Sequence, residues 1–155
     1  MSITDTLEYR KATKDDLLRI IGMLANDRLG KNREKTGEEI AEGYARFFDM
    51  ISVDINNDIY VVEHESSIIG TFQLTFIPSI SFGGHWRAHV ESVRVATTYR
   101  GQGIGTAMMN KICAMAADRN CLMVQLTSNK QRKEAIEFYK RLGFEASHEG
   151  FKKYL

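Results

Sequence analysis

The spacing of apolar residues along the chain predicts four helices. The first apolar run begins at Leu17, shortly after Thr13, whose hydroxyl group can cap a helix. Positions three and four residues apart are also apolar in three later segments, and Gly143 should stop the last of them. The predicted helices cover roughly residues 14–28, 37–53, 104–115 or somewhat beyond, and 133–142.

Stretches rich in β-branched and aromatic residues predict strands between and after these helices. A hairpin is expected from two strands joined by a tight Glu65-Ser66 turn. Next comes a loop that holds the only proline, a glycine pair and the only tryptophan, Trp86, which makes it a candidate binding surface. The predicted strands are 58–64, 67–77, 89–95, 122–127 and a final extended pair at 144–148 and 151–155, and the loop is 78–88.

Composition fits one ordinary folded domain spanning residues 1–155, because 43% of the residues are hydrophobic and 26% are charged. Two cysteines are too few for a disulfide framework, and no leader or long apolar run is present, so a cytoplasmic protein that does not span a membrane is expected. A net charge of +1 argues against binding nucleic acid through bulk electrostatics.

A glycine-rich turn lies between the strand at 89–95 and the helix that follows. Gly101, Gly103 and Gly105 remove side chains where backbone N–H groups could approach an anion, and Arg100 could contact the same anion. A tight turn whose glycines only permit close packing is the alternative. The segment lacks the lysine of a P-loop, and its glycines are too close together for a dinucleotide-binding fingerprint.

Two motifs in order resemble those of the GCN5-related N-acetyltransferase superfamily. The first is the segment Val93-Arg-Val-Ala-Thr-Thr-Tyr-Arg-Gly-Gln-Gly-Ile-Gly105, and the second runs from Ala135 through Tyr139 to Gly143-Phe144. The resemblance implies a mixed α/β acyl-CoA N-acyltransferase fold, with a central, mostly antiparallel twisted sheet flanked by about four helices. The chain departs from the family pattern at Thr97 and Arg132, where proline and asparagine are common.

The resemblance also implies an acetyltransferase that moves the acetyl group of acetyl-CoA directly to a primary amine, without a metal. Backbone groups of Val93 and Val95 would hold the acetyl-pantetheine arm beside a strand that a local bulge splays from its neighbour. The other expected cofactor-binding residues are Arg100, Gly101, Gln102, Gly103, Ile104, Gly105, Thr106 and Arg132.

Tyr139 is the candidate catalytic acid, since a phenol with a reference pKa near 10 stays protonated at neutral pH and can donate a proton to a departing thiolate. It also lies on an apolar helical stripe, so a role in the core is the alternative. Glu91 is the candidate base, acting through water, although it could instead be a solvated residue or an ion-pair partner of a nearby arginine. His89 and His85 are the next candidates for the base.

The acceptor is expected to be a small-molecule or peptide amine, bound near Trp86 and His89. Two histidines four residues apart on a strand are not brought together, and no cysteine or carboxylate pair completes a metal site. Two other functions remain open: a catalytically silent acyl-CoA sensor or regulatory module of the same fold, and a DNA-binding regulator, against which the near-neutral charge argues. The sequence also leaves a homodimer open.

Overall fold

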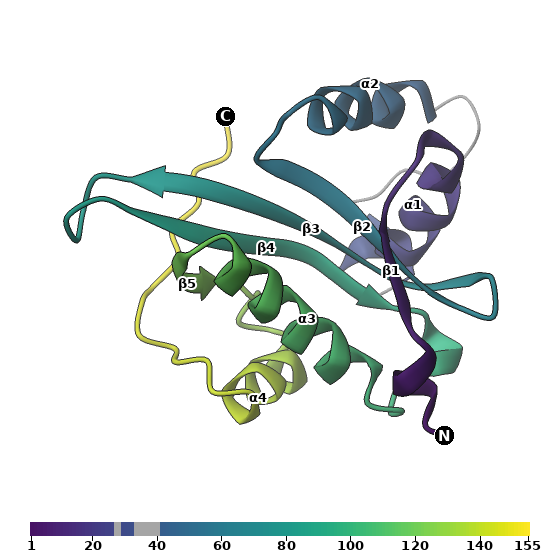
Figure 1. Ribbon diagram of the computed structural model, residues 1–155. Coiled ribbons are helices and arrows are strands. Elements are labelled where there is room, and N and C mark those ends of the chain that lie inside the picture. Colours follow the sequence, from purple (N-terminus) through teal and green to yellow (C-terminus); the bar gives the residue numbers. More distant parts are fainter. Residues whose placement is uncertain (27–28, 33–40) are drawn as a thin grey trace. The chain divides into compact units, whose positions relative to one another are not determined.

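The computed structural model describes residues 1–26, 29–32 and 41–155, and these form two compact units, Met1–Gln125 and Leu126–Leu155. The first unit contains the sheet and helices α1 to α3, and the second contains helix α4 (Figure 1). The prediction of a single domain over residues 1–155 stays a prediction.

Five strands of the first unit form one sheet. Their order in the sheet follows the chain, the first four are antiparallel, and β5 runs parallel to β4. The predicted hairpin is β2 and β3, and its turn residues Glu65 and Ser66 have φ values of 47° and 62°, which match the twist of the strands that they join. The strands are β1 (Glu8–Lys11), β2 (Asn57–His64), β3 (Ser67–Ser79), β4 (His85–Val95) and β5 (Cys121–Gln125).

Each helix predicted from apolar spacing is present in the described residues, with changed ends. The first begins with a 3-10 turn at Lys14–Asp16 and ends at Ala25, and residues 37–40, the expected start of the second, lie outside the described part. The helices are α1 (Leu17–Ala25), α2 (Ala41–Ser52), α3 (Ile104–Asp118) and α4 (Lys133–Arg141). The mixed α/β fold with a mostly antiparallel sheet is confirmed.

The predicted loop over 78–88 is wrong at both ends. Strand β3 continues to Ser79 and β4 starts at His85, so Trp86 lies in a strand opposite Pro78. A proline is tolerated in a strand where its nitrogen is not needed as a donor, so it does not end β3. The turn is made instead around Gly83 and Gly84, whose φ values of 79° and 85° favour glycine.

The two final strands predicted at 144–148 and 151–155 are also wrong, because the structure assigns no strand to either segment. Alternation of apolar and polar residues shows that a segment can be extended, but a strand also needs a partner edge with which to exchange hydrogen bonds. The sequence pattern carried no information about that partner.

The two faces of the sheet in the first unit carry different helices. Alternate residues of β3, among them Phe72, Leu74 and Phe76, face α3, whose Met108 and Ile112 are fully buried. The residues between them, such as Thr71 and Gln73, share the other face with Ile59 of β2, which packs against α1 and α2. We call these the α3 face and the α1/α2 face.

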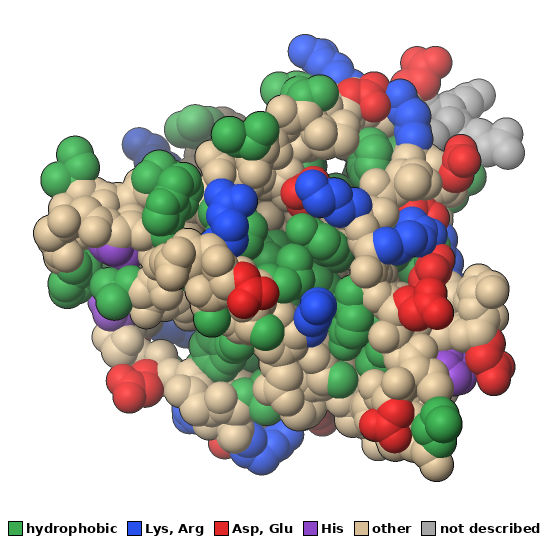
Figure 2. Space-filling model, in the orientation of Figure 1, with side chains coloured by type: hydrophobic (Ala, Val, Ile, Leu, Met, Phe, Trp, Pro, Cys, Tyr) green, Lys and Arg blue, Asp and Glu red, His purple; other side chains and the backbone are tan. Residues whose placement is uncertain are grey.

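The exposed surface mixes charges of both signs. On the face of the molecule drawn in Figure 2, Lys and Arg side chains are interspersed with Asp and Glu side chains, in keeping with the net charge of +1. None of the helices among the described residues is both long and apolar enough to cross a membrane.

A buried carboxylate joins the start of α1 to the edge of the sheet. Asp16 is 8% exposed, and it accepts hydrogen bonds from Arg10 of β1 at 2.6 and 3.0 Å and from the N–H of Thr13 at 2.7 Å. Arg10 also binds Glu63 of β2 at 2.6 Å. Arg10 therefore connects β1, β2 and the N-terminus of α1.

Asp16→Asn is expected to lower the free energy of unfolding at pH 7 by about 1–2 kcal/mol. The hydrogen bonds from Arg10 lower the pKa of Asp16 from 3.8 to about 2. A pKa lowered by folding stabilises the folded state above the unfolded-state value, near pH 4, and this contribution is lost as the pH falls towards 2. Urea unfolding of parent and variant at pH 7 and pH 2.5 should therefore give a smaller difference at the lower pH; equal differences would contradict the assignment.

Candidate active site

Strand β4 carries a bulge next to Glu91. On β3 the register advances two residues from Thr71 to Gln73, whereas on β4 it advances three, from Glu91 to Arg94. The extra residue is accommodated at Ser92, whose φ of 56° lies in the left-handed region that costs a residue other than glycine about 1 kcal/mol. The bulge predicted from the resemblance is confirmed.

Beyond this bulge, β4 has an edge that β5 does not cover. Strand β5 pairs with β4 only from Trp86 to His89. Since the N–H of Ala96 donates to Ile69 of β3 at 2.8 Å, and backbone groups alternate between the two edges of a strand, the N–H and C=O groups of Val93 and Val95 point to the uncovered edge.

Two arginine side chains bind carbonyl groups at this edge. Arg94 Nη1 donates to the Val93 carbonyl at 2.8 Å, and Arg100 Nε donates to the Val95 carbonyl at 3.2 Å. Side chains, and not a paired strand of the sheet, thus occupy these carbonyls, so an extended molecule with amides of its own could bind the edge if the two arginine side chains moved away.

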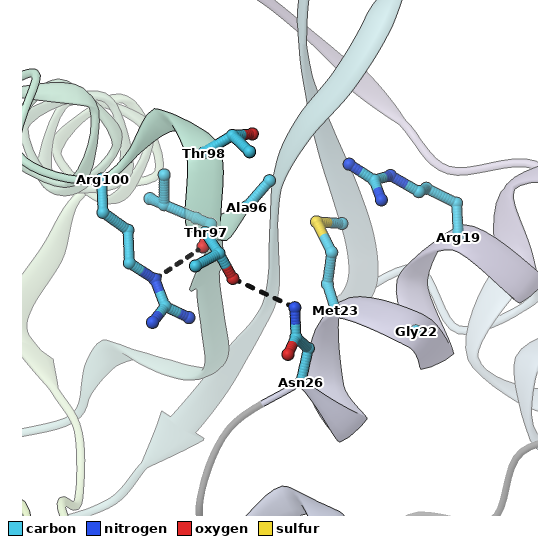
Figure 3. Close-up of a pocket in the computed structure, with 9 residues that line it drawn as sticks. Arg19, Gly22, Met23, Asn26, Ala96, Thr97, Thr98 and Arg100 are labelled. Atoms are coloured by element: carbon cyan, nitrogen blue, oxygen red, sulfur yellow. Dashed lines mark hydrogen bonds between the residues drawn. The ribbon is translucent and has the colours of Figure 1, made fainter.

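A pocket of about 160 Å³ lies between α1 and the segment that follows this edge (Figure 3). One wall comes from α1 and its C-cap Asn26, whose Nδ2 donates to Thr97 Oγ1 at 3.0 Å. The other wall contains Arg100, and Val95 belongs both to the pocket and to the uncovered edge. The lining residues are Arg19, Gly22, Met23, Asn26, Val95, Ala96, Thr97, Thr98 and Arg100.

The glycine-rich turn leads directly into α3. Gly101 and Gly103 have φ values of 77° and 79°, and Gly103 is the N-cap residue of α3 without a side chain that could cap the helix. The first helical hydrogen bond runs from the N–H of Ala107 to the carbonyl of Gly103 at 3.0 Å. The N–H groups of residues 104–106 precede it, so they are donors at the positive end of the helix and can bind an anion.

The remaining residues of the turn are fixed in different ways. Gln102 Nε2 donates to the carbonyl of Thr98 at 3.3 Å. Ile104 is 1% exposed, so its side chain anchors the start of α3 in the core. Gly105 and Thr106 form the first turn of the helix. The turn therefore combines an anchored side chain with accessible backbone donors.

His89 and Glu91 lie together on the α1/α2 face of β4. His89 Nε2 is 3.5 Å from Glu91 Oε2, and the Glu91 side chain is 49% exposed. Their paired residues on β3 are Thr75 and Gln73, whose side chains donate to Asn57 Oδ1 at 3.1 and 3.0 Å. An accessible carboxylate and an imidazole thus stand just before the bulge, on a polar part of the sheet.

A family model described as the acetyltransferase (GNAT) family matches residues 27–144. This chain belongs to the GNAT acetyltransferase family. The matched residues include the bulged strand, the glycine-rich turn and α4, and the resemblance seen in the two sequence motifs is confirmed.

Named GNAT enzymes are among the relatives. The chain is 28% identical over 147 residues to thialysine N-epsilon-acetyltransferase of Mus musculus, covering 92% of this chain and 85% of that protein. It is 35% identical over 79 residues to glucosamine 6-phosphate N-acetyltransferase of Trypanosoma brucei brucei, covering 51% of this chain. The match spans only 52% of that enzyme, about half its length.

A solved structure is more similar still, and its description differs. A crystal structure described as a transcriptional regulator from Bacillus halodurans C-125 is 41% identical, with a TM-score of 0.92 over 96% of this chain and 99% of that one. Similarity at this level supports a shared fold over nearly the whole chain.

The second GNAT motif forms the end of α4 in the unit Leu126–Leu155. Gly143, with a φ of 88°, follows the last helical turn, and the N–H of Phe144 donates to the carbonyl of Tyr139 at 3.1 Å. The ring centroids of Tyr139 and Phe144 are 5.8 Å apart. This is a Schellman motif with its usual apolar contact, so the spacing of Tyr139, Gly143 and Phe144 has a structural reason of its own.

At the other end of α4, Arg132 is the N-cap residue, and its carbonyl accepts the helical hydrogen bond from the N–H of Ile136 at 3.1 Å. Arg132 and Tyr139 thus lie on one helix of the second unit, at its start and in its last turn. Their proposed contacts with acetyl-CoA stay predictions.

The expected acceptor residues do not all lie together. Trp86 shares the α3 face with Phe76, and the Arg119 guanidinium lies 5.5 Å from its ring, whereas His89 lies on the opposite face of β4. His85 is near the hairpin turn, with its Nδ1 2.8 Å from the Ser81 carbonyl. Of these residues, only His89 stands beside Glu91, and a binding role for Trp86 stays a prediction.

Sequence reasoning missed the wall of the pocket that α1 supplies. Arg19 and Asn26 are far from the glycine-rich turn in the sequence, and neither belongs to a motif. Within the described residues, no group of three or more His, Cys, Asp and Glu side chains could hold a metal ion.

Proposed function

We propose that this chain is an N-acetyltransferase that moves the acetyl group of acetyl-CoA directly to a primary amine. The observation that carries the proposal is the uncovered edge of β4 beside the uncapped N-terminus of α3. Acetyl-CoA has an extended arm with two amides and a pyrophosphate. The edge can bind the amides, and the N–H groups of the turn can bind the pyrophosphate.

Each part of the cofactor would then have a defined set of partners. Backbone groups of Val93 and Val95 would hold the pantetheine arm once the side chains of Arg94 and Arg100 move from the carbonyls that they bind. The N–H groups from Gly101 to Thr106 would surround the pyrophosphate, and the Arg100 guanidinium would add a positive charge. Arg132 is proposed as a further contact.

The transfer itself needs a base, an acid and a positioned carbonyl. The amine nitrogen bonds to the acetyl carbon while the bond from carbon to sulfur breaks. In this proposal Glu91 takes the amine proton through water, a backbone amide of β4 donates to the developing oxyanion, and Tyr139 donates its proton to the departing thiolate. Desolvation raises the pKa of Cys113 and of Cys121, which disfavours an acyl-enzyme intermediate on either thiol.

Turnover of acetyl-CoA against a broad panel of primary amines, read as release of free thiol, tests this function. Thiol release that requires both protein and an amine, with formation of the N-acetyl product, supports it. If acetyl-CoA binds and none of the amines gives product, the chain is not the enzyme proposed.

The same measurement addresses a second candidate, a regulatory module that binds acyl-CoA without transferring it. The description of the Bacillus halodurans structure as a transcriptional regulator is the observation in its favour. The presence of both Glu91 and Tyr139 favours the enzyme. We propose a small-molecule or peptide amine as the partner, and no nucleic acid or membrane. The cytoplasmic location and a homodimer stay predictions.

Glu91→Gln is expected to depress the rate mainly at lower pH. The parent rate should rise with pH as the base and the amine lose their protons, and a primary amine partly loses its proton in alkali without help. The difference between parent and variant should therefore shrink as the pH increases, with acetyl-CoA affinity retained. A uniform loss across the pH profile of kcat/KM would show that Glu91 has another role.

A further inference from the structure

Buried nitrogen atoms without a hydrogen-bond partner among the described residues include two on the α1/α2 face of β4. They are Arg87 Nε and His89 Nδ1, two residues apart on the strand that also carries Glu91. More than nine in ten buried polar groups in folded proteins are hydrogen-bonded, so each exception needs an explanation. His89 lies beside Glu91, which the proposed function makes the base for the amine.

The chemistry of arginine limits which groups could be the missing hydrogen-bond partner of Arg87. The guanidinium keeps its charge at any physiological pH and has donors but no acceptor, so its partner must supply oxygen lone pairs. No described carboxylate forms an ion pair with Arg87, and the only carboxylate on this face of β3 and β4 is Glu91, which lies beside His89. Carboxylates and phosphates match the shape and the charge of a guanidinium.

The strand between Arg87 and Glu91 separates two kinds of binding group. Arg87 and Glu91 are four residues apart, so their Cα atoms are separated by about 13 Å along an extended strand. The neighbouring side chains on β2 and β3 are uncharged and already hydrogen-bonded, since Gln73 and Thr75 both donate to Asn57 Oδ1. A molecule bound on this part of the α1/α2 face would thus have an anion-binding residue at one end and the proposed base at the other.

We propose that the amine acceptor carries a carboxylate or phosphate group at some distance from its amine, and that Arg87 binds this anion while the amine faces Glu91. The inference rests on the proposed function, and it makes Arg87 a specificity-determining residue. His89 lies between the two ends, with its Nε2 beside Glu91.

Matched pairs of acceptors that differ only in the anion test the proposal. The carboxylate pair is 6-aminohexanoate and 6-aminohexanamide, and the phosphate pair is 2-aminoethyl phosphate and ethanolamine. The anionic member of at least one pair should have the higher kcat/KM. Arg87→Gln should raise its KM by about 10- to 100-fold, the loss typical of a hydrogen bond to a charged group, with little change in kcat or in the kinetics of the neutral member.

A matched control removes one positive charge from the other face of the sheet. Lys111 of α3 is exposed, with its Nζ 5.8 Å from the ring of Tyr9, so Lys111→Gln should leave the preference for the anionic acceptor unchanged. Arg87→Lys keeps the charge and should recover part of the affinity. If Lys111→Gln has the same effect as Arg87→Gln, long-range attraction rather than contact is responsible, and the proposal is overturned.

Titration calorimetry of the same probes with the CoA-bound protein separates this inference from the proposed function. Binding of an anionic probe that depends on Arg87, without any turnover, would support the anion site and count against the enzyme. Turnover that is indifferent to the anion and to Arg87→Gln would overturn the anion site while the enzyme stands. Failure of both anionic probes to bind would overturn the anion site as well.

Discussion

Tyr139→Phe is expected to lower kcat by about 100-fold or more while acetyl-CoA affinity changes little. The substitution removes one oxygen atom and keeps the aromatic ring between Phe138 and Phe144, whose ring centroids lie 5.2 and 5.8 Å from that of Tyr139. The hydrogen bonds that end α4 use the backbone carbonyl of Tyr139, so they are unchanged. If the phenol donates the proton to the thiolate, catalysis is lost and the helix is kept.

The measurement is steady-state kinetics with an acceptor that the parent protein uses, together with calorimetry for acetyl-CoA. Tyr154→Phe is a matched control, since it removes the same atom from a side chain of the same unit that is 88% exposed, and it should retain the parent kcat. A folded Tyr139→Phe variant with the parent kcat would show that Tyr139 is not the catalytic acid. If Glu91→Gln also keeps the parent rate across the pH range, His89 is the next residue to test.

Local patterns in the sequence predicted most of the fold, because they report on local geometry. The Glu65-Ser66 turn is flanked by two β-rich stretches, and the apolar spacing after Gly103 is that of a helix. The errors occur where a distant partner decides the structure. Residues 151–155 have the pattern of a strand without a paired edge, and Pro78 remains in β3 because the pairing with β4 continues past it.

In the candidate site, too, the features set by local sequence were predicted and those set by a distant partner were not. The bulge and the turn belong to one continuous segment whose motif carries its own geometry, so both could be predicted. Which residues share a face depends on the register between strands. An ion pair with an arginine was one alternative to the role of Glu91 as the base, yet the structure puts Glu91 beside His89 and leaves Arg87 Nε without a partner among the described residues. Trp86 is three residues from His89, an odd number, which explains why the two lie on opposite faces.

The glycine-rich turn admits a test that separates anion binding from close packing. Gly103→Asp is expected to weaken acetyl-CoA binding by about 100-fold or more, equivalent to roughly 2.7 kcal/mol, whereas Gly103→Asn should lose much less. Both side chains are among those that best tolerate the φ of 79° at this position. A Cβ atom there would meet only Thr4 Cγ2, at 3.6 Å, which is an ordinary contact.

The two variants therefore differ in charge and hardly in shape. A carboxylate at the start of α3 interacts favourably with the positive end of the helix, so the Asp variant should be at least as stable as the Asn variant in a thermal melt. The same carboxylate repels the pyrophosphate that the N–H groups of residues 104–106 are proposed to bind. Stability and cofactor affinity should thus change in opposite directions between the two variants, a result that general damage to the turn would not produce. If calorimetry finds equal acetyl-CoA affinity for both variants, the glycines serve close packing and the cofactor lies elsewhere.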